Sequence, residues 1–276
     1  MKPMEVGVFL CSTGIEDPFE AAVKLNELGV TNTQIGALPP EMYVSDVAEK
    51  LKAHLADLGI TPTTQFVGFP GESYASMDAV AETVGFLHAD LIEERLEITR
   101  KAIDFAVVLG VPRVAAHIGF VPADHSDPAY QKLVSDMQGV ADYAAENGLG
   151  FSLETGQETA EELLHFFQDI GRDNVGINFD PANLILYGKD KPIDALELLK
   201  DHVVSCHCKD GVWPEQDGEL GSEAPLGEGQ VDIPAFVAKL KEIGYTGPLT
   251  IEREAGDDRI GDITRGRALL ESLRDS

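Results

Sequence analysis

Short runs of apolar residues alternate along the chain with longer segments in which apolar residues recur every three or four positions. The short runs are typical of buried strands, and the longer spacing is typical of amphipathic helices. The pattern predicts strands at residues 6–11, 31–36, 61–69, 113–119, 150–154, 175–180, 203–208 and 249–252. It predicts helices at residues 18–28, 44–58, 91–109, 130–147, 159–170, 193–199, 233–243 and 263–273.

A glycine stands between several predicted helices and the strand that follows, namely Gly29, Gly59, Gly110, Gly148 and Gly244. Glycine favours the positive φ with which many helices end. Repeated joints of helix, glycine and strand imply parallel strands connected by crossover helices. Eight such units without a break in composition fit a closed barrel better than a doubly wound sheet. We therefore expect an α/β protein with one domain over residues 1–276, a (β/α)8 TIM barrel.

The composition is that of an ordinary globular protein, with 43% apolar and 25% charged residues. No apolar run approaches the ~20 residues that a membrane span requires, and the first one, EVGVFLC, is too short for a signal peptide. Cys11, Cys206 and Cys208 lack CxxC spacing, which suits a reducing compartment. We therefore expect a cytoplasmic protein with no membrane partner. The sequence leaves open whether the protein forms a homo-oligomer.

The chain is strongly acidic, with 48 acidic residues against 21 basic ones and a formal net charge of −27. Such a surface repels a polyanion. The charge therefore disfavours nucleic acid as a partner.

Four consecutive predicted strands end in a potential metal ligand: Glu154, Asp180, His207 and Glu252. In a (β/α)8 barrel the C-terminal ends of the strands meet at one face, where catalytic groups lie. Any one of these residues alone is more typical of a turn, a helix cap or a core contact. Together they predict a site for one divalent cation. Three carboxylates and an imidazole suit Mn²⁺ best, with Mg²⁺, Co²⁺ or Zn²⁺ also open.

The segment VVSCHC places His207 between two cysteines. Side chains in a strand alternate between faces, so Cys206 and Cys208 point one way and His207 the other. We therefore expect the histidine to face the barrel mouth and both cysteines to pack beneath the surrounding helices.

The chain resembles the xylose isomerase-like TIM barrel superfamily, which includes the sugar phosphate isomerase/epimerase family. The resemblance spans nearly the whole chain and is strongest in AHIG, LETGQE, INFDPANL, HCKD and PLGEGQVDIPAFVAKLKEIGYTGPLTIERE. It implies that Glu154, Asp180, His207 and Glu252 hold one divalent cation. It also implies that Glu154 and Glu252 exchange the substrate proton.

Two positions depart from the free-ketose 3-epimerases of that superfamily. Asn183 stands where those enzymes carry a substrate-binding histidine, and Trp213 stands where they carry an arginine. The DPANL and GEGQVD segments look closer to the sugar-phosphate and acid-sugar branches and to relatives that eliminate or hydrate oxidised sugars.

Proton transfer beside a carbonyl, through a planar enediolate, is the simplest chemistry for such a site. Glu154 and Glu252 would flank that plane, one removing the proton and the other returning it. The prediction is a metal-dependent isomerase or epimerase of a sugar or sugar phosphate. A lyase or hydratase of a keto-sugar or 3-keto-glycoside stays open, as does a non-catalytic sugar-binding barrel.

Further candidates for substrate binding lie near the predicted strand ends: His117, Asn183, Lys209, Trp213 and Glu158. A buried core histidine is an equal alternative for His117. Residues 68–80 and 209–230 are rich in glycine and proline and long enough to cover the mouth of the barrel.

Overall fold

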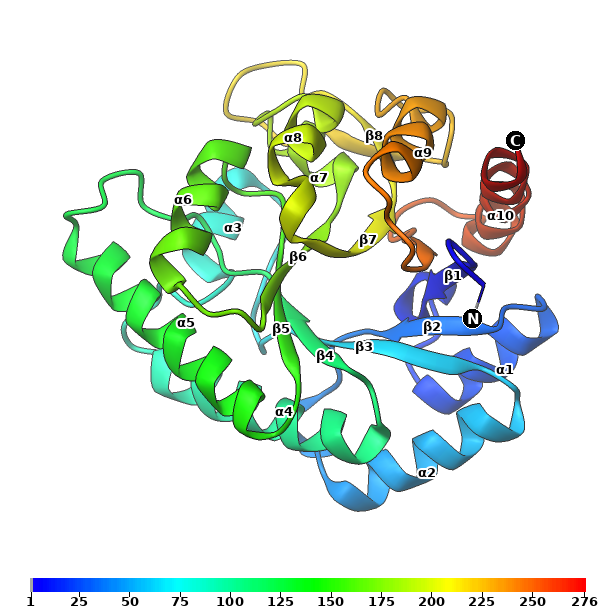
Figure 1. Cartoon of the computed structure of the whole chain (residues 1–276), viewed down its shortest axis with the longest axis horizontal. Helices are drawn as coiled ribbons and strands as arrows, with labels where there is room; N and C mark the ends of the chain where they lie inside the picture. The colour runs from blue at the N-terminus through cyan, green and yellow to red at the C-terminus, as the bar shows by residue number, and fades with distance from the viewer. Residues whose placement is uncertain (1) are drawn as a thin grey trace.

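A closed barrel of parallel strands forms the centre of the molecule (Figure 1). The computed structural model describes residues 2–276. The barrel strands are β1 (Val6–Phe9), β2 (Asn32–Ile35), β3 (Thr61–Val67), β4 (Arg113–Ala116), β5 (Gly150–Glu154), β6 (Val175–Phe179), β7 (Val203–Cys208) and β10 (Leu249–Ile251). They pair in the order β1-β10-β7-β6-β5-β4-β3-β2, and β2 pairs with β1 to close the ring. The predicted (β/α)8 TIM barrel is confirmed.

Helices surround the barrel and bury their apolar faces against it (Figure 1). The larger ones are α1 (Pro18–Glu27), α2 (Ser45–Asp57), α4 (Ile92–Leu109), α5 (Pro128–Glu146), α6 (Ala160–Ile170), α8 (Pro192–Leu199), α9 (Ile233–Glu242) and α10 (Arg259–Asp275). Short 3₁₀ turns are η1 (Leu10–Thr13), η2 (Pro40–Met42) and η3 (Lys200–His202). None of the helices within residues 2–276 combines the length and apolar character that crossing a bilayer requires.

Local sequence explains most helix ends. The five glycines expected to end helices have φ between 68° and 89°, a range that glycine adopts without steric cost. Helix α6 begins with a capping box in which Thr159 and Glu162 satisfy each other's backbone amides. Helix α10 begins at Arg259, earlier than the apolar pattern predicted, because Asp258 caps it by accepting from the Gly261 amide.

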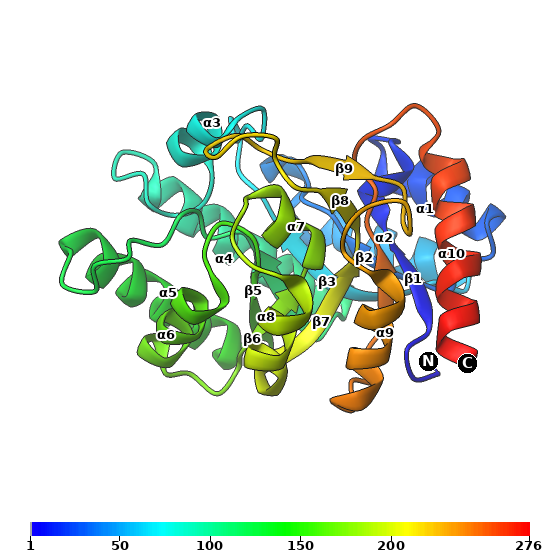
Figure 2. The ribbon, with the colours of Figure 1, turned by 90° about the horizontal axis from the view of Figure 1, so that it is seen from above.

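Several elements lie where the sequence pattern predicted neither a helix nor a strand. Strands β8 (Asp210–Val212) and β9 (Ser222–Ala224) form an antiparallel hairpin after β7. Helix α3 (Met77–Thr83) follows β3, and helix α7 (Pro181–Leu186) follows β6. Figure 2 shows the hairpin and α3 on the same side of the barrel. These insertions cover the end of the barrel at which the strands finish.

Cys206 and Cys208 lie in the apolar layer between the strands and the helices, and both are fully buried. His207, between them, contacts Gln34 of β2 and Glu154 of β5 instead. Because neither β2 nor β5 is adjacent to β7 in the ring, these contacts cross the inside of the barrel. The predicted division of faces is confirmed.

Candidate active site

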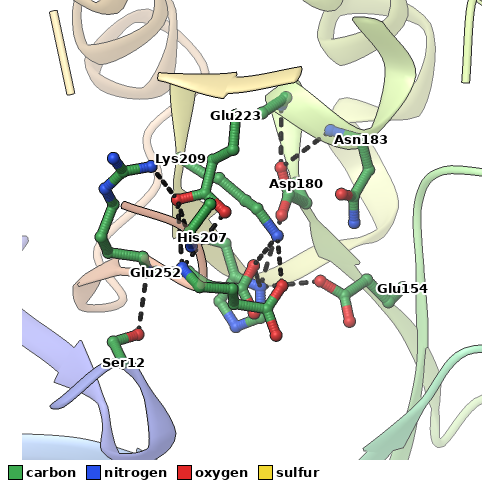
Figure 3. Close-up of polar contacts among 12 residues, drawn as sticks. Ser12, Glu154, Asp180, Asn183, His207, Lys209, Glu223 and Glu252 are labelled. Carbon is green, nitrogen blue, oxygen red and sulfur yellow. Dashed lines mark hydrogen bonds and ion pairs between the residues drawn. The ribbon is translucent and has the colours of Figure 1, made fainter. Parts of the chain in front are cut away.

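Four side chains from consecutive strands of the second half of the barrel meet at its mouth. Glu154 ends β5, Asp180 follows β6, His207 lies in β7, and Glu252 follows β10. One ligand atom from each lies within 4.8 Å of the others, and all four residues are buried. Figure 3 shows these side chains converging on one point. The arrangement offers three carboxylates and one imidazole to a single cation.

The His207 ring is fixed on both sides. Its Nδ1 lies 2.7 Å from Glu154 Oε1 and 3.1 Å from Glu252 Oε2. Its Nε2 donates to Gln34 Oε1 at 2.7 Å. The ring also packs against Phe9 and Phe66, whose centroids are 5.0 and 5.1 Å from its own. Nδ1 is therefore the nitrogen presented to the carboxylates and to a cation.

Asp180 has one engaged and one free oxygen. Oδ1 accepts from the backbone amides of Ala182 at 2.8 Å and Asn183 at 3.1 Å, which caps helix α7. Oδ2 is buried without a hydrogen-bond partner, and it lies 3.7 Å from His207 Nδ1. A buried carboxylate oxygen without a donor is strongly unfavourable unless a cation balances it. The donor set of this site therefore fits a divalent metal ion.

The charges of the cluster favour a positive species at its centre. Burial lowers the pKa of His207, but Glu252, Glu154 and Asp180 outweigh this effect, so the pKa lies well above its usual 6.5. Burial raises the pKa of Glu252, but His207 and Lys209 reverse that shift and leave the pKa below its usual value. Carboxylates that stabilise a protonated imidazole in this way would stabilise a metal cation at the same place.

Lys209 continues the charge network toward the rim. Its Nζ lies 3.0 Å from Glu252 Oε2 and 2.7 Å from Glu254 Oε2. The lysine is only 5% exposed. Burial alone would lower the pKa of Lys209, but the carboxylates of Glu252 and Glu254 outweigh this effect and raise the pKa well above its usual value. The ammonium therefore stays charged. Lys209 thus holds Glu252 in place.

A cavity of about 340 Å³ adjoins the cluster, with Glu154 and Glu252 in its lining. Its lining comprises Phe9, Cys11, Ala37, Phe66, Val67, Gly68, Glu72, Tyr74, His117, Glu154, Asn183, Leu186, Tyr187, Lys209, Leu220, Gly221, Glu223, Glu252 and Glu254. Three of the predicted substrate residues, His117, Asn183 and Lys209, are among them. The His117 Nε2 lies 3.1 Å from Glu154 Oε2, so this histidine belongs to the site.

The two other predicted substrate residues lie outside the lining. Trp213 packs against the apolar core, and its amide donates to Gln230 Oε1. Glu158 is 2% exposed, and neither of its carboxylate oxygens has a hydrogen-bond partner. Burial raises the pKa of Glu158 to about 8. A substrate role for either residue stays a prediction.

Some residues of the site carry no strong local sequence signal. Gln34 orients His207 and also donates to Asn178 Oδ1 at 3.4 Å. Glu72 and Glu223 line the cavity from the loop after β3 and from the hairpin. The one hint in the sequence is Gln34 itself, in the predicted strand TNTQIG, because a side-chain amide that becomes buried needs a hydrogen-bond partner.

Comparison with known proteins agrees with this architecture. The family model described as xylose isomerase-like TIM barrel matches residues 20–274. The crystal structure of a xylose isomerase domain protein from Planctomyces limnophilus is 39% identical, with a TM-score of 0.92, covering 99% of this chain and 98% of that one.

Curated relatives match over a shorter span. An L-ribulose 3-epimerase of Methylomonas sp. is 29% identical over 56% of this chain and 54% of its own length. An L-ribulose-5-phosphate 3-epimerase of Salmonella paratyphi C is 26% identical over 62% of this chain and 61% of its own length. The chain therefore aligns with little more than half of the length of these relatives.

Proposed function

Because the chain belongs to the xylose isomerase-like TIM barrel family, we propose that it is a divalent-metal-dependent isomerase or epimerase of small sugars. The observation that supports this most is the buried cluster of Glu154, Asp180, His207 and Glu252 at the base of a cavity. The cavity lies at the small end of the ~300–1,000 Å³ usual for ligand sites, which suits a small sugar. Relatives of the chain include enzymes named as sugar epimerases.

The four clustered residues would hold the metal. When bound, the cation polarises a substrate carbonyl and the adjacent hydroxyl, which makes the neighbouring C–H more acidic. Mn²⁺ is the ion we expect, since the ligands are mostly carboxylate oxygens. We also expect the enzyme to work in the cytoplasm, which its unpaired cysteines support.

Glu154 and Glu252 would carry the proton. They come from the ends of β5 and β10, and lie 2.7 and 3.1 Å from His207 Nδ1. One carboxylate would remove the proton beside the carbonyl to give an enediolate, and the other would return it. His117 holds Glu154 and Lys209 holds Glu252, so both carboxylates are positioned before substrate arrives.

The test is solvent exchange. Protein loaded with Mn²⁺ is incubated in D₂O with a panel of ketoses, their phosphates and 3-keto-glycosides, and products are followed by NMR. We expect an epimer or isomer that carries deuterium at the carbon next to the carbonyl, and no such product after the metal is removed by a chelator. An unsaturated product would assign a lyase instead, and no product from any sugar would contradict catalysis.

A further inference from the structure

Building on the proposed function, we infer the substrate class of the site: an uncharged sugar that carries no phosphate or carboxylate group. Among the described residues that line the cavity, five are glutamates and one is a lysine, and none is an arginine. The sequence segments DPANL and GEGQVD look closer to the sugar-phosphate branches, so the structure and those segments favour different substrates.

The lining lysine is not free to bind a phosphate. Lys209 is buried, and its ammonium contacts Glu252 on one side and Glu254 on the other. Two carboxylates therefore balance its single charge. A phosphate would have to displace Glu254 and would then lie beside Glu252.

Arg253, which follows Glu252 in the chain, is also held by carboxylates. Arg253 is 6% exposed, and its guanidinium pairs with Glu223 and Asp262. Its own backbone amide donates to Ser12 Oγ at 3.0 Å. This side chain fixes the β8–β9 hairpin to the end of β10 and offers the cavity no positive charge.

Several backbone amides near the mouth, the other usual phosphate donors, donate to carboxylates. Asp180 accepts the amides at the start of α7, which is where a helix would otherwise attract an anion. Glu223 accepts the amides of Glu254 and Ala255.

Two more carboxylates accept backbone amides in the loops at the mouth. Asp210 accepts the amides of Gly227, Gly229 and Val231. Glu72 accepts those of Phe69 and Gly85.

The rest of the lining suits the apolar face and hydroxyl groups of a neutral sugar. Phe9, Phe66, Tyr74 and Tyr187 contribute aromatic surface, and Leu186 and Leu220 contribute aliphatic surface. Asn183 and His117 offer side-chain groups that donate to or accept from hydroxyls. The same carboxylates that repel a phosphate accept hydrogen bonds from hydroxyl groups.

Matched pairs of sugars test the inference. With the Mn²⁺-loaded enzyme, kcat/KM is measured for L-ribulose against L-ribulose 5-phosphate and for D-fructose against D-fructose 6-phosphate. Binding of the inert polyols ribitol and ribitol 5-phosphate is measured in parallel by calorimetry. We expect the neutral member of each pair to be favoured by about 100-fold, the scale of a buried like-charge contact.

The binding arm separates this inference from the proposed function. If no ketose turns over but ribitol binds more tightly than its phosphate, the proposed function fails and the substrate class stands. If L-ribulose 5-phosphate turns over better than L-ribulose, the function stands and the inference is overturned. Equal binding of the two polyols, or binding of neither, also overturns it.

A charge variant tests the stated cause. Glu254→Gln leaves Lys209 less compensated, so the ratio of the affinity for ribitol 5-phosphate to that for ribitol should rise about fivefold over the wild type. Glu219→Gln removes the same charge from an exposed position of the segment between β8 and β9, outside the cavity lining. An equal gain in both variants would attribute the effect to net charge and contradict the local argument.

Discussion

His207 Nε2 donates a hydrogen bond of 2.7 Å to Gln34 Oε1, across the inside of the barrel from β7 to β2. The amide oxygen can only accept, so the bond keeps the proton on Nε2 and leaves Nδ1 facing the three carboxylates. Gln34 in turn donates to Asn178, whose amide lies 3.5 Å from Glu154 Oε1. A chain of amides thus orients two of the four ligands.

Replacement of Gln34 by leucine should weaken metal binding. The imidazole would lose the acceptor that fixes its orientation, and the affinity for Mn²⁺ should fall by about 10- to 100-fold. Titration with Mn²⁺ followed by calorimetry measures this change. Gln65→Leu is the matched control, since Gln65 is also a buried strand glutamine but donates to the Gly36 and Phe66 carbonyls. Equal losses in both variants would mean that Gln34 only stabilises the fold.

The alternation of faces in β7 predicts different results for neighbouring residues. His207→Ala should abolish tight metal binding, because it removes the only nitrogen ligand of the cluster. Cys206→Ala and Cys208→Ala should keep the metal and lose about 1 kcal/mol of unfolding free energy each, the cost of a small cavity. Elemental analysis of the purified variants measures bound metal, and urea denaturation measures stability. Loss of metal in either cysteine variant would contradict the assignment of faces.

The proposed proton transfer predicts a large kinetic effect at two positions. Glu154→Gln and Glu252→Gln each keep an oxygen donor but lose the base, so turnover should fall by ~10² or more. Steady-state assays at saturating Mn²⁺ separate this loss from weaker metal binding. Glu215→Gln, an exposed residue after β8, should behave as the wild type. Near-normal turnover in both site variants would rule out the two-carboxylate mechanism.

Asp210 should stabilise the segment that covers the mouth. Its carboxylate accepts the amides of Gly211, Gly227, Gly229 and Val231 at 2.9 to 3.1 Å. Asp210→Ala leaves these donors without their acceptor and should lower the unfolding free energy by about 3 kcal/mol.

Hydrogen exchange of residues 225–231 should also become faster in Asp210→Ala. Asp217→Ala, at an exposed position of the segment between β8 and β9, should change neither quantity. Slow exchange in the Asp210 variant would show that other contacts order the segment.

Glu158 should make stability depend on pH. Burial raises its pKa in the folded protein to about 8, above the ordinary value of 4.5. The folded state therefore holds this proton more tightly, and stability is lost as pH rises from about 4.5 toward 8. Glu158→Gln removes the ionisation, so the variant should gain stability over the wild type across this range, on the order of 4 kcal/mol at pH 8.

Thermal unfolding at pH 5 and pH 8 measures the Glu158 effect. Glu161→Gln, an exposed neighbour at the start of α6, should follow the wild-type profile. A constant difference between Glu158→Gln and the wild type at both pH values would mean that Glu158 has the same pKa in the folded and unfolded protein, and would contradict the raised pKa. Turnover of the same variant decides whether Glu158 also serves the substrate.

The barrel was predictable because its signals are local. A strand shows as a short apolar run and a helix as a three-to-four repeat, and glycines at positive φ separate the two. Hairpin β8–β9 and helices α3 and α7 were not predicted, because they are too short to show a clear period. The start of helix α7 is also hard to recognise in the sequence, because Asp180 directly follows strand β6 and is itself the residue that caps the helix.

The sequence by itself determined the barrel and the clustering of Glu154, Asp180, His207 and Glu252, since parallel strands bring their C-terminal ends together and alternation leaves one face of β7 to His207. Only the tertiary structure decided that Gln34 meets His207, 173 residues away. It also decided that Lys209 is paired with two glutamates and that Trp213 is not part of the cavity lining. Local patterns fix which way a backbone segment turns its side chains. They do not fix which distant side chain it meets, because that depends on how the closed barrel packs.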